Sequence, residues 1–233
     1  MKSSDEGPHR TPRSAREEVI HWTRTVGILP AIKLTQPADL LPYVRALCKA
    51  GVRVVEITAT TPGVLDALKT ASAEFGDDLY LGVGTVLDAE TARAAIMAGA
   101  RLIVNPAVVP EVVAMAHRYG AACYSGAFTA TECLSAMLAG ADMVKIFPAA
   151  LGGPRYMLNL KMVYPEVNLI PSGGITLQDA GEFIKCGACA VSGSRQFVNA
   201  EMVKQHGFEW ITERTKEFIK VVEEARKSPY PLP

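Results

Sequence analysis

The sequence lacks the features that mark membrane, secreted and nucleic-acid-binding proteins. Its 233 residues contain no apolar run of about 18 residues, the length expected of a membrane-spanning helix. Lys and Arg together number 24, as do Asp and Glu, so the formal net charge is +0 and no basic surface for nucleic acid is indicated. Residues 1–13 are polar, without the apolar core of a signal peptide, and we expect a disordered tail there. We therefore expect a cytoplasmic protein whose partners include neither nucleic acid nor membrane.

The sequence is also poor in the residues that hold catalytic metals. Its histidines fall in the tail or in stretches with a helical pattern: His9, His21, His117 and His206. Its five cysteines are an odd, scattered set, and the C-x-x-C formed by Cys186 and Cys189 has no second pair and no nearby histidine. A structural zinc site needs about four such ligands. We therefore expect these cysteines to be reduced packing residues, and we predict no metal and no other cofactor.

Short apolar stretches alternate with helical patterns through most of the chain. The predicted strands cover residues 28–32, 52–57, 79–84, 102–104, 121–124, 142–148, 167–171 and 188–192. The predicted helices cover residues 39–50, 62–75, 88–98, 110–119, 129–138, 154–163, 177–186 and 201–227, with a break near Gly207. An additional helix, residues 14–25, precedes the first strand, with Ser14 and Glu17 at the positions of a capping box. Such alternation predicts a parallel sheet in an α/β protein.

Two α/β architectures fit this alternation, and the sequence favours one of them. Eight strand–helix units predict a (β/α)8 TIM barrel with an extra N-terminal helix, formed as a single domain by residues 14–233. The alternative is a doubly wound open sheet, which usually carries a glycine-rich loop after its first strand. Residues 30–37 follow or end the first strand here and contain no glycine. The barrel is therefore the preferred interpretation.

Two ionisable side chains stand within apolar strands, Glu56 in the second and Lys145 in the sixth. Active sites of this barrel lie at the carboxyl ends of the strands, so both side chains are expected at one mouth. Loss of hydration disfavours the charged form of a lysine, and a neutral amine can form a Schiff base with a carbonyl. A neighbouring carboxylate can serve as the base. The alternatives are a lysine that reaches out to water and a purely structural ion pair.

Small residues follow the last two predicted strands. Ser172, Gly173 and Gly174 follow the seventh strand, and Gly193 and Ser194 follow the eighth. Glycines let backbone amides approach an anion, and the loops after these two strands are the usual phosphate site of the barrel. These turns predict a phosphate-binding site. The alternative is a pair of ordinary tight turns.

A set of motifs in the same order resembles the 2-keto-3-deoxy-6-phosphogluconate (KDPG) and 4-hydroxy-2-oxoglutarate (KHG) aldolase family. The resemblance runs from about Gly27 to Phe197 and leaves out the first helix and about the last 35 residues. The motifs are Val54-Val55-Glu56-Ile57-Thr58, Gly82-Val83-Gly84-Thr85-Val86, Asn105-Pro106, Gly126 with Thr129 to Glu132, Val144-Lys145-Ile146-Phe147-Pro148-Ala149, Pro171-Ser172-Gly173-Gly174-Ile175 and Gly193-Ser194.

The resemblance implies a metal-free class I aldol cleavage. A 2-keto-3-deoxy sugar acid, most simply KDPG, would give pyruvate and an aldehyde, glyceraldehyde 3-phosphate. Lys145 would be the Schiff-base lysine and Glu56 the general acid and base. The implied substrate-binding residues are Thr58, Thr60, Thr85, Pro106, Phe147 and Ser172, and the implied phosphate-binding residues are Gly173, Gly174, Gly193 and Ser194. Family members are commonly homotrimers, so a homotrimer is expected.

Two positions depart from the family pattern. Many members carry an arginine four residues after the glutamate, where this sequence has Thr60, and Arg195 follows Ser194. A hydroxyl group cannot make the bidentate contact that an arginine makes with a carboxylate. KHG and the galactose-series epimer of KDPG therefore stay open as substrates. Two other functions also stay open: a phosphosugar isomerase or epimerase that uses Glu56 as its base, and a non-catalytic phosphosugar-binding barrel.

Overall fold

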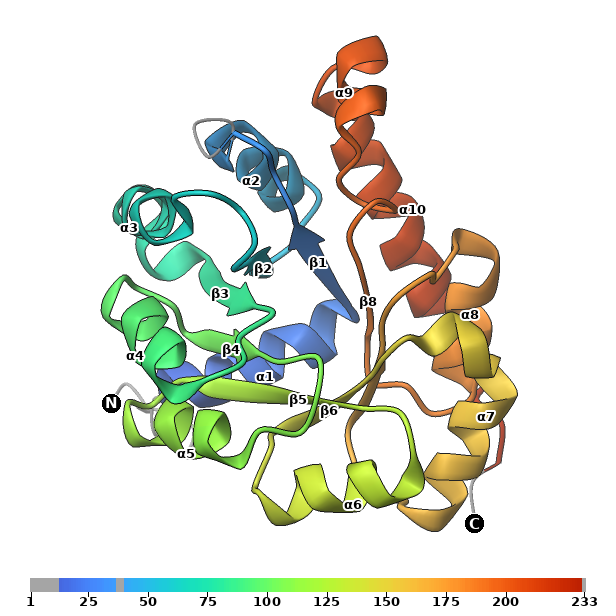
Figure 1. Ribbon diagram of the computed structural model, residues 1–233. Coiled ribbons are helices and arrows are strands. Elements are labelled where there is room, and N and C mark those ends of the chain that lie inside the picture. Colours follow the sequence, from blue (N-terminus) through green and yellow to red (C-terminus); the bar gives the residue numbers. More distant parts are fainter. Residues whose placement is uncertain (1–12, 37–39, 232–233) are drawn as a thin grey trace, which may run out of the picture.

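Eight parallel strands form the centre of the molecule, and a ring of helices surrounds them (Figure 1). The computed structural model describes residues 13–36 and 40–231. Its strands are β1 (Ile28–Ile32), β2 (Val54–Thr58), β3 (Tyr80–Gly84), β4 (Leu102–Val104), β5 (Ala122–Ala127), β6 (Met143–Ile146), β7 (Leu169–Pro171) and β8 (Val191–Gly193). Strands β1 to β7 pair in sequence order, and β8 pairs with β1. Parallel bridges from Leu169 to Ala188 and from Ser172 to Ser192 join β7 to the β8 segment, so the sheet closes on itself.

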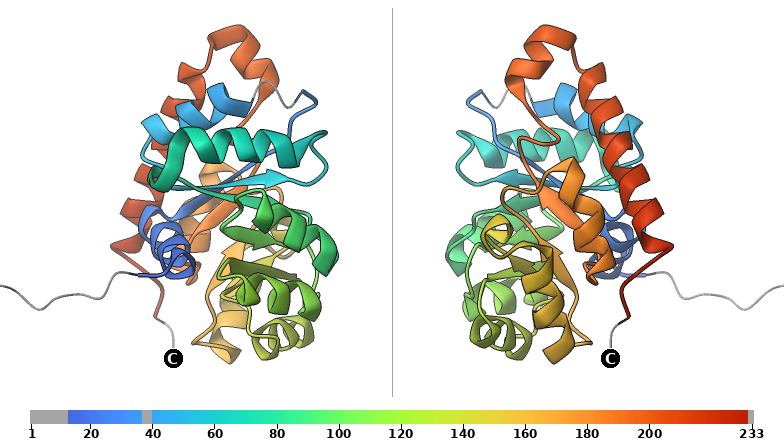
Figure 2. Two further views of the ribbon diagram at one scale, coloured as in Figure 1. Left: turned by 90° about the vertical axis from the view of Figure 1, so that its left-hand side faces the viewer. Right: turned by 90° about the vertical axis from the view of Figure 1, so that its right-hand side faces the viewer.

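Each strand is followed by a helix that covers the outside of the barrel. These helices are α2 (Leu40–Lys49), α3 (Val64–Phe75), α4 (Ala89–Met97), α5 (Pro110–Arg118), α6 (Ala130–Leu138), α7 (Ala149–Val163) and α8 (Leu177–Lys185), and β8 is followed by α9 (Ala200–His206) and α10 (Glu209–Arg226). A short 3-10 helix, η2 (Gly76–Asp78), follows α3. Helix α10 runs along the side of the barrel and packs against both α8 and α2, which completes the ring (Figure 2). The predicted (β/α)8 barrel is confirmed.

Most predicted elements lie within a few residues of their observed bounds, and two differ for a physical reason. Strand β5 was predicted to end at residue 124 but continues to Ala127, because Ser125 and Gly126 pair in register with Val144 and Lys145 of β6. Helix α7 was predicted to start at residue 154 but already starts at Ala149. Its first turn is separated from the rest by a kink at Gly153, whose φ of 69° and ψ of −179° are not helical. The predicted break in the last helix is observed at Gly207.

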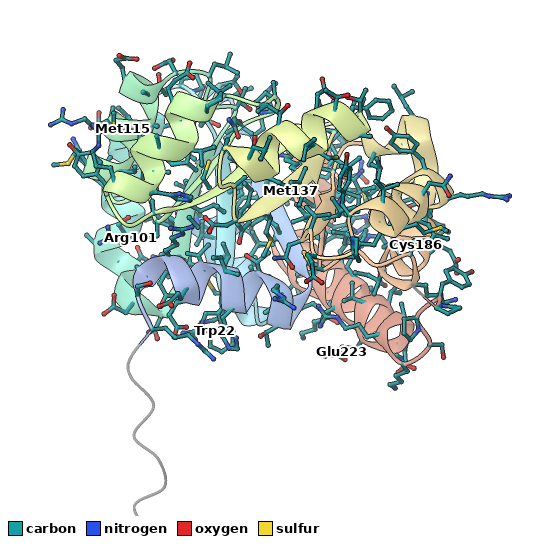
Figure 3. All side chains as sticks on the ribbon, turned by 90° about the horizontal axis from the view of Figure 1, so that it is seen from below. Trp22, Arg101, Met115, Met137, Cys186 and Glu223 are labelled. Atoms are coloured by element: carbon teal, nitrogen blue, oxygen red, sulfur yellow. The ribbon has the colours of Figure 1, made fainter. Side chains whose placement is uncertain are left out.

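The extra N-terminal helix α1 (Ala15–Val26) closes the end of the barrel where the strands begin. Its capping box is present, with Glu17 and Ser14 bonded to each other as predicted. Val19 packs into a buried cluster inside the barrel, together with Leu29, Val54, Leu102, Val104, Ala122, Tyr124, Met143, Ile170 and Ala190. The hydroxyl group of Tyr124 donates a hydrogen bond of 2.8 Å to Oγ1 of Thr23. Trp22, labelled in Figure 3, packs against the same cluster. The barrel is therefore sealed at this end by apolar and hydrogen-bonded contacts.

A buried carboxylate ties α1 to the start of β6. Asp142 accepts hydrogen bonds of 2.8 Å from Nε of Arg16 and 2.8 Å from the amide of Cys123. Arg16 binds Oδ1 and Cys123 binds Oδ2, and Oδ2 also lies 3.1 Å from Nε2 of His117 on α5. The strand that carries Lys145 thus begins directly after a residue that contacts three separate elements, α1, β5 and α5.

Two predictions from the sequence concern residues that the structure does not describe. The tail expected over residues 1–13 is described at Arg13 alone, and the predicted helix start at Asp39 also lies outside the described residues. Within residues 13–36 and 40–231, no helix is both long enough and apolar enough to cross a membrane.

Candidate active site

Glu56 and Lys145 meet inside the barrel although their strands lie on opposite sides of it. Strands β2 and β6 are four places apart in the eight-stranded order. Nζ of Lys145 lies 3.3 Å from Oε2 and 3.5 Å from Oε1 of Glu56. Glu56 is 1% exposed and Lys145 is 9% exposed. The structure thus places an amine and a carboxylate in direct contact, largely away from water.

The strand period explains why these two side chains converge. Val54 and Met143 belong to the interior cluster, and residues two apart on a strand point to the same side. Glu56 and Lys145 therefore lie one layer above that cluster, toward the carboxyl ends of the strands. Gly84 on β3 makes room for the carboxylate, since a Cβ atom added there would overlap Oε1 of Glu56.

A pocket of about 470 Å³ opens above the pair. It is lined by Ala31, Lys33, Glu56, Thr58, Thr85, Pro106, Lys145, Phe147, Ser172, Gly173, Gly174, Gly193, Ser194, Arg195 and Gln196. The structure thus brings together at one mouth every predicted site residue except Thr60.

Thr60 lines a neighbouring cavity instead, together with Lys33, Ser194 and Arg195. Its Oγ1 lies 3.1 Å from Oγ1 of Thr58, which lines the catalytic pocket. Four lining residues, Ala31, Lys33, Arg195 and Gln196, are not among the predicted site residues, although Arg195 was noted as a departure from the family pattern. Ala31 follows Leu29 by two residues on β1, so strand alternation was a signal for it, whereas no sequence signal points to Gln196.

Thr85 has an unusual backbone conformation at the edge of the pocket. Its φ is 61°, and among the described residues it is the one non-glycine residue with a positive φ. A β-branched side chain strongly disfavours this region, and such strain is typically found at functional sites. Thr85 thus combines a strained backbone conformation with a place in the lining of the pocket.

The glycine turn after β7 presents free backbone donors to the pocket. Gly173 and Gly174 both have positive φ, 85° and 81°. Neither amide donates a hydrogen bond to any other described residue. A Cβ atom at Gly173 would lie 2.9 Å from the ring of Phe147, so the absence of a side chain lets the aromatic ring cover the turn. Free amides in such a turn are suited to binding an anion.

The cysteines lie outside this pocket and are all free thiols. Burial raises the pKa of Cys189 to about 11, and its thiol group donates a hydrogen bond of 3.2 Å to the carbonyl of Leu169. Burial also raises the pKa of Cys186. In the described part of the chain, no three His, Cys, Asp or Glu side chains are grouped as metal ligands. The C-x-x-C cysteines are therefore packed, protonated thiols in this structure.

The chain was compared with known proteins. The family model "KDPG and KHG aldolase" matches residues 19–214. The 2-dehydro-3-deoxy-phosphogluconate aldolase of Treponema pallidum is 33% identical over 198 residues, which cover 84% of this chain and 94% of that protein. The 2-dehydro-3-deoxy-6-phosphogalactonate aldolase of Escherichia coli is also 33% identical, over 175 residues that cover 75% of this chain and 85% of that protein.

Solved structures show the same likeness. The KDPG aldolase of Legionella pneumophila, with pyruvate captured as a covalent carbinolamine intermediate, superposes with a TM-score of 0.75 at 28% identity and covers 82% of this chain and 92% of that chain. A native KDPGal structure superposes with a TM-score of 0.80 at 29% identity. The match covers 86% of this chain and 96% of that chain. The family model matches most of this chain, and the chain places an amine–carboxylate pair inside a (β/α)8 barrel. This chain therefore belongs to the KDPG and KHG aldolase family.

Proposed function

We propose that this protein is a Schiff-base aldolase that cleaves 2-keto-3-deoxy-6-phosphogluconate to pyruvate and glyceraldehyde 3-phosphate. The observation that carries the proposal is the contact of 3.3 Å between Nζ of Lys145 and Oε2 of Glu56 at the base of the pocket. The covalent carbinolamine of pyruvate in the Legionella pneumophila relative supports the same chemistry.

The pair supplies both groups that the reaction needs. Glu56 accepts the proton that the Lys145 ammonium must lose, and the free amine attacks the C2 carbonyl of the substrate. Glu56 then donates a proton to the leaving hydroxide, and water departs to leave an iminium ion. The carboxylate next removes the proton of the C4 hydroxyl group, the C3–C4 bond breaks, and its electrons pass to the iminium ion. Protonation of the resulting enamine at C3 and hydrolysis release pyruvate and restore the lysine.

The other pocket residues have roles that follow from their chemistry. Thr85 and Pro106 would bound the pyruvate end, close to Lys145. The free amides of Gly173 and Gly174, with Gly193 and Ser194, would bind the phosphate at the other end. Thr58, Ser172 and Phe147 also line the pocket and would hold the carbon chain.

The assembly and setting of the enzyme are part of the proposal. Residues 14–233 would act as one barrel domain, in the cytoplasm, where the five free thiols stay reduced. We also propose a homotrimer, supported by the exposed apolar side chains Leu134 and Leu138 on α6 and Leu151 on α7. A designed protein cage built by fusing symmetric oligomeric domains contains a chain with the same fold, with a TM-score of 0.80. Light scattering after size-exclusion chromatography tests the trimer, and a monomer would contradict it.

Borohydride trapping tests the chemistry. The protein is incubated with pyruvate, reduced with borohydride and digested, and the adduct is located by peptide mass. A pyruvate-derived mass gain on Lys145 is expected in the wild type and in Lys204→Met, a variant of an exposed lysine, but not in Lys145→Met. A folded wild-type protein that forms no adduct would overturn the proposed aldolase and favour an isomerase or a binding protein.

A further inference from the structure

A third polar side chain lies in the layer of the barrel interior that holds Glu56 and Lys145. Each of these two residues follows a member of the interior cluster by two positions in the chain. Ser192 on β8 does the same, because Ala190 belongs to that cluster. An interior layer of this fold takes its side chains from alternate strands, and β2, β6 and β8 are such strands. Ser192 is therefore in the same layer as the catalytic pair.

The pairing of β8 with both of its neighbours supports this direction. Ser192 is paired with Leu29 on β1, which belongs to the interior cluster. On its other side, Ser192 is bridged to Ser172, which lines the catalytic pocket. Paired residues on neighbouring strands place their side chains on the same face of a sheet. The Ser192 side chain therefore points into the barrel, next to the pocket.

The hydroxyl group of Ser192 is buried and unpaired. Ser192 is 0% exposed, and its Oγ makes no hydrogen bond with any residue that the structure describes. A buried hydroxyl group without a partner destabilises the folded state, whereas an alanine would fill almost the same space without this cost. Such a group needs a physical explanation, and a partner that arises only during the reaction provides one.

The proposed reaction creates a hydrogen-bond donor that needs a new acceptor in this layer. At rest, Nζ of Lys145 donates to Glu56 alone among the described residues. After the amine has condensed with C2 of the substrate, the iminium ion keeps one N–H, since the other bonds of the nitrogen join Cε and C2. Glu56 then acts at the C4 hydroxyl group. The charged N–H is left largely away from water, where an unpaired donor is costly.

We propose that Ser192 is a further positioning residue of the aldolase, and that its Oγ accepts a hydrogen bond from the iminium N–H of Lys145 while Glu56 acts on the substrate. The inference rests on the proposed aldolase function. The two residues enter one layer from strands two places apart, so rotation of the Lys145 side chain is the movement that the bond requires. The bond fixes the plane of the iminium ion, so the C3–C4 bond stays aligned with the π system that takes up its electrons.

The stability of the imine with pyruvate tests this role. The protein is mixed with a series of pyruvate concentrations and reduced with borohydride for a fixed short time, and the adduct on Lys145 is quantified by peptide mass. Ser192→Ala is expected to raise the pyruvate concentration for half-maximal trapping by about tenfold, the effect of one hydrogen bond to a charged group. The kcat/KM of Ser192→Ala for cleavage is expected to fall by about tenfold or more.

Two further variants separate the hydroxyl group from packing. Ser192→Cys fills the space of the serine but offers only a weak acceptor, so it is expected to behave like Ser192→Ala. Ser125→Ala is the matched control, because Ser125 is also 0% exposed with an unpaired Oγ among the described residues. Its neighbours two residues away, Cys123 and Ala127, pack in the cluster between strands and helices, so it points away from the catalytic pair. Ser125→Ala is expected to leave trapping unchanged.

The melting temperature distinguishes a positioning role from a structural one. Ser192→Ala and Ser125→Ala each lose a buried hydroxyl group that is unpaired at rest, so both are expected to melt at or above the temperature of the wild type. Circular dichroism follows the melting of each variant. A lower melting temperature of Ser192→Ala would show that the hydroxyl group already has a partner in the resting protein, which would overturn the inference.

Two trapping results would also overturn the inference. One is half-maximal trapping of Ser192→Ala within about threefold of the wild-type pyruvate concentration. The other is wild-type trapping in Ser192→Cys, or an equal loss in Ser125→Ala, since either would assign the effect to packing. An adduct on Lys145 in the wild type together with any of these results overturns the role of Ser192 alone. A folded wild type that forms no adduct overturns the aldolase and this inference together.

Discussion

Nζ of Lys145 lies 3.3 Å from Oε2 of Glu56, and the two residues reach each other from strands on opposite sides of the barrel. Both side chains are buried. Each charge is therefore the main electrostatic partner of the other. Loss of one partner leaves the other unpaired in a site with little water, whereas loss of both leaves no uncompensated charge.

The first prediction concerns the stability of this pair. Lys145→Met is expected to lower the free energy of unfolding by about 3–5 kcal/mol, because the Glu56 carboxylate loses its partner. The double variant Glu56→Gln with Lys145→Met is expected to recover most of that loss. Urea unfolding followed by circular dichroism measures both. Lys69→Met breaks an exposed pair with Asp66 and is expected to change stability by less than about 1 kcal/mol. If the double variant loses as much free energy of unfolding as the two single variants lose together, the two charges are not coupled.

The second prediction concerns the space beside Glu56. Gly84→Ala is expected to lower kcat for aldol cleavage by about a hundredfold, because the added Cβ atom overlaps the carboxylate and displaces the general base. The matched control is Gly181→Ala in α8, where the nearest atom to the added Cβ is 3.3 Å away and activity is expected to be unchanged. An active Gly84→Ala enzyme with normal kcat would show that the observed position of Glu56 is not needed for catalysis.

The third prediction separates stability from activity at Thr85. Its φ of 61° is costly for a β-branched residue and ordinary for glycine. Thr85→Gly is therefore expected to keep or raise the melting temperature while kcat/KM for cleavage falls by about tenfold or more, since a hydrogen-bonding hydroxyl group is lost from the pocket. Thr70→Gly, at an exposed position of α3, is expected to lower the melting temperature without a loss of activity. A marked loss of stability in Thr85→Gly would mean that the Thr85 side chain stabilises the fold.

The fourth prediction concerns acid stability at the start of α6. The amides of Thr129 and Phe128 and the Thr129 hydroxyl group donate hydrogen bonds to Glu132, and these bonds hold the pKa of its carboxyl group below the usual range. A lowered pKa in the folded state means that the stabilisation is present above the pKa of the unfolded chain and is lost as the pH falls through the folded value.

Glu132→Gln removes this titrating group, so its melting temperature is expected to fall less between pH 6 and about pH 3 than that of the wild type. Scanning calorimetry at several pH values gives the comparison. Glu209→Gln, at an exposed residue whose side chain makes no hydrogen bond with another described residue, is the control and is expected to follow the wild type. Parallel pH curves for Glu132→Gln and the wild type would contradict a role for Glu132 in acid stability.

The alternation of side chains along each strand predicted which side chains meet, and it requires only residues that are close in sequence. Val54 and Glu56 share a face of one strand, as do Met143 and Lys145, so a charged layer above an apolar one follows once the barrel is assumed. Helix ends could also be predicted from the sequence, because the capping boxes at Ser14 and Thr129 are built from residues three apart in the chain.

Other features depend on residues that are distant in the sequence, so they could not be predicted from local patterns. Strand β5 continues through Ser125 and Gly126 because β6 offers partners there, which the turn-forming character of Ser and Gly conceals. The positive φ of Thr85 contradicts its local preference. The position of the Thr60 side chain depends on how the chain leaves β2, so the family resemblance placed it in the catalytic pocket, whereas it lines the cavity beside it.

Helix α1 leaves the barrel with one open end. Because Val19 and the bond from Tyr124 to Thr23 seal the other end, the reactants and both products must pass the same rim. In the proposed reaction, the carbons joined to Lys145 would lie innermost, and the aldehyde would lie between them and solvent. Release must then be ordered, with the aldehyde leaving first and pyruvate last. Steady-state kinetics would show this order as inhibition by pyruvate that is competitive with the sugar acid, and inhibition by the aldehyde that is not.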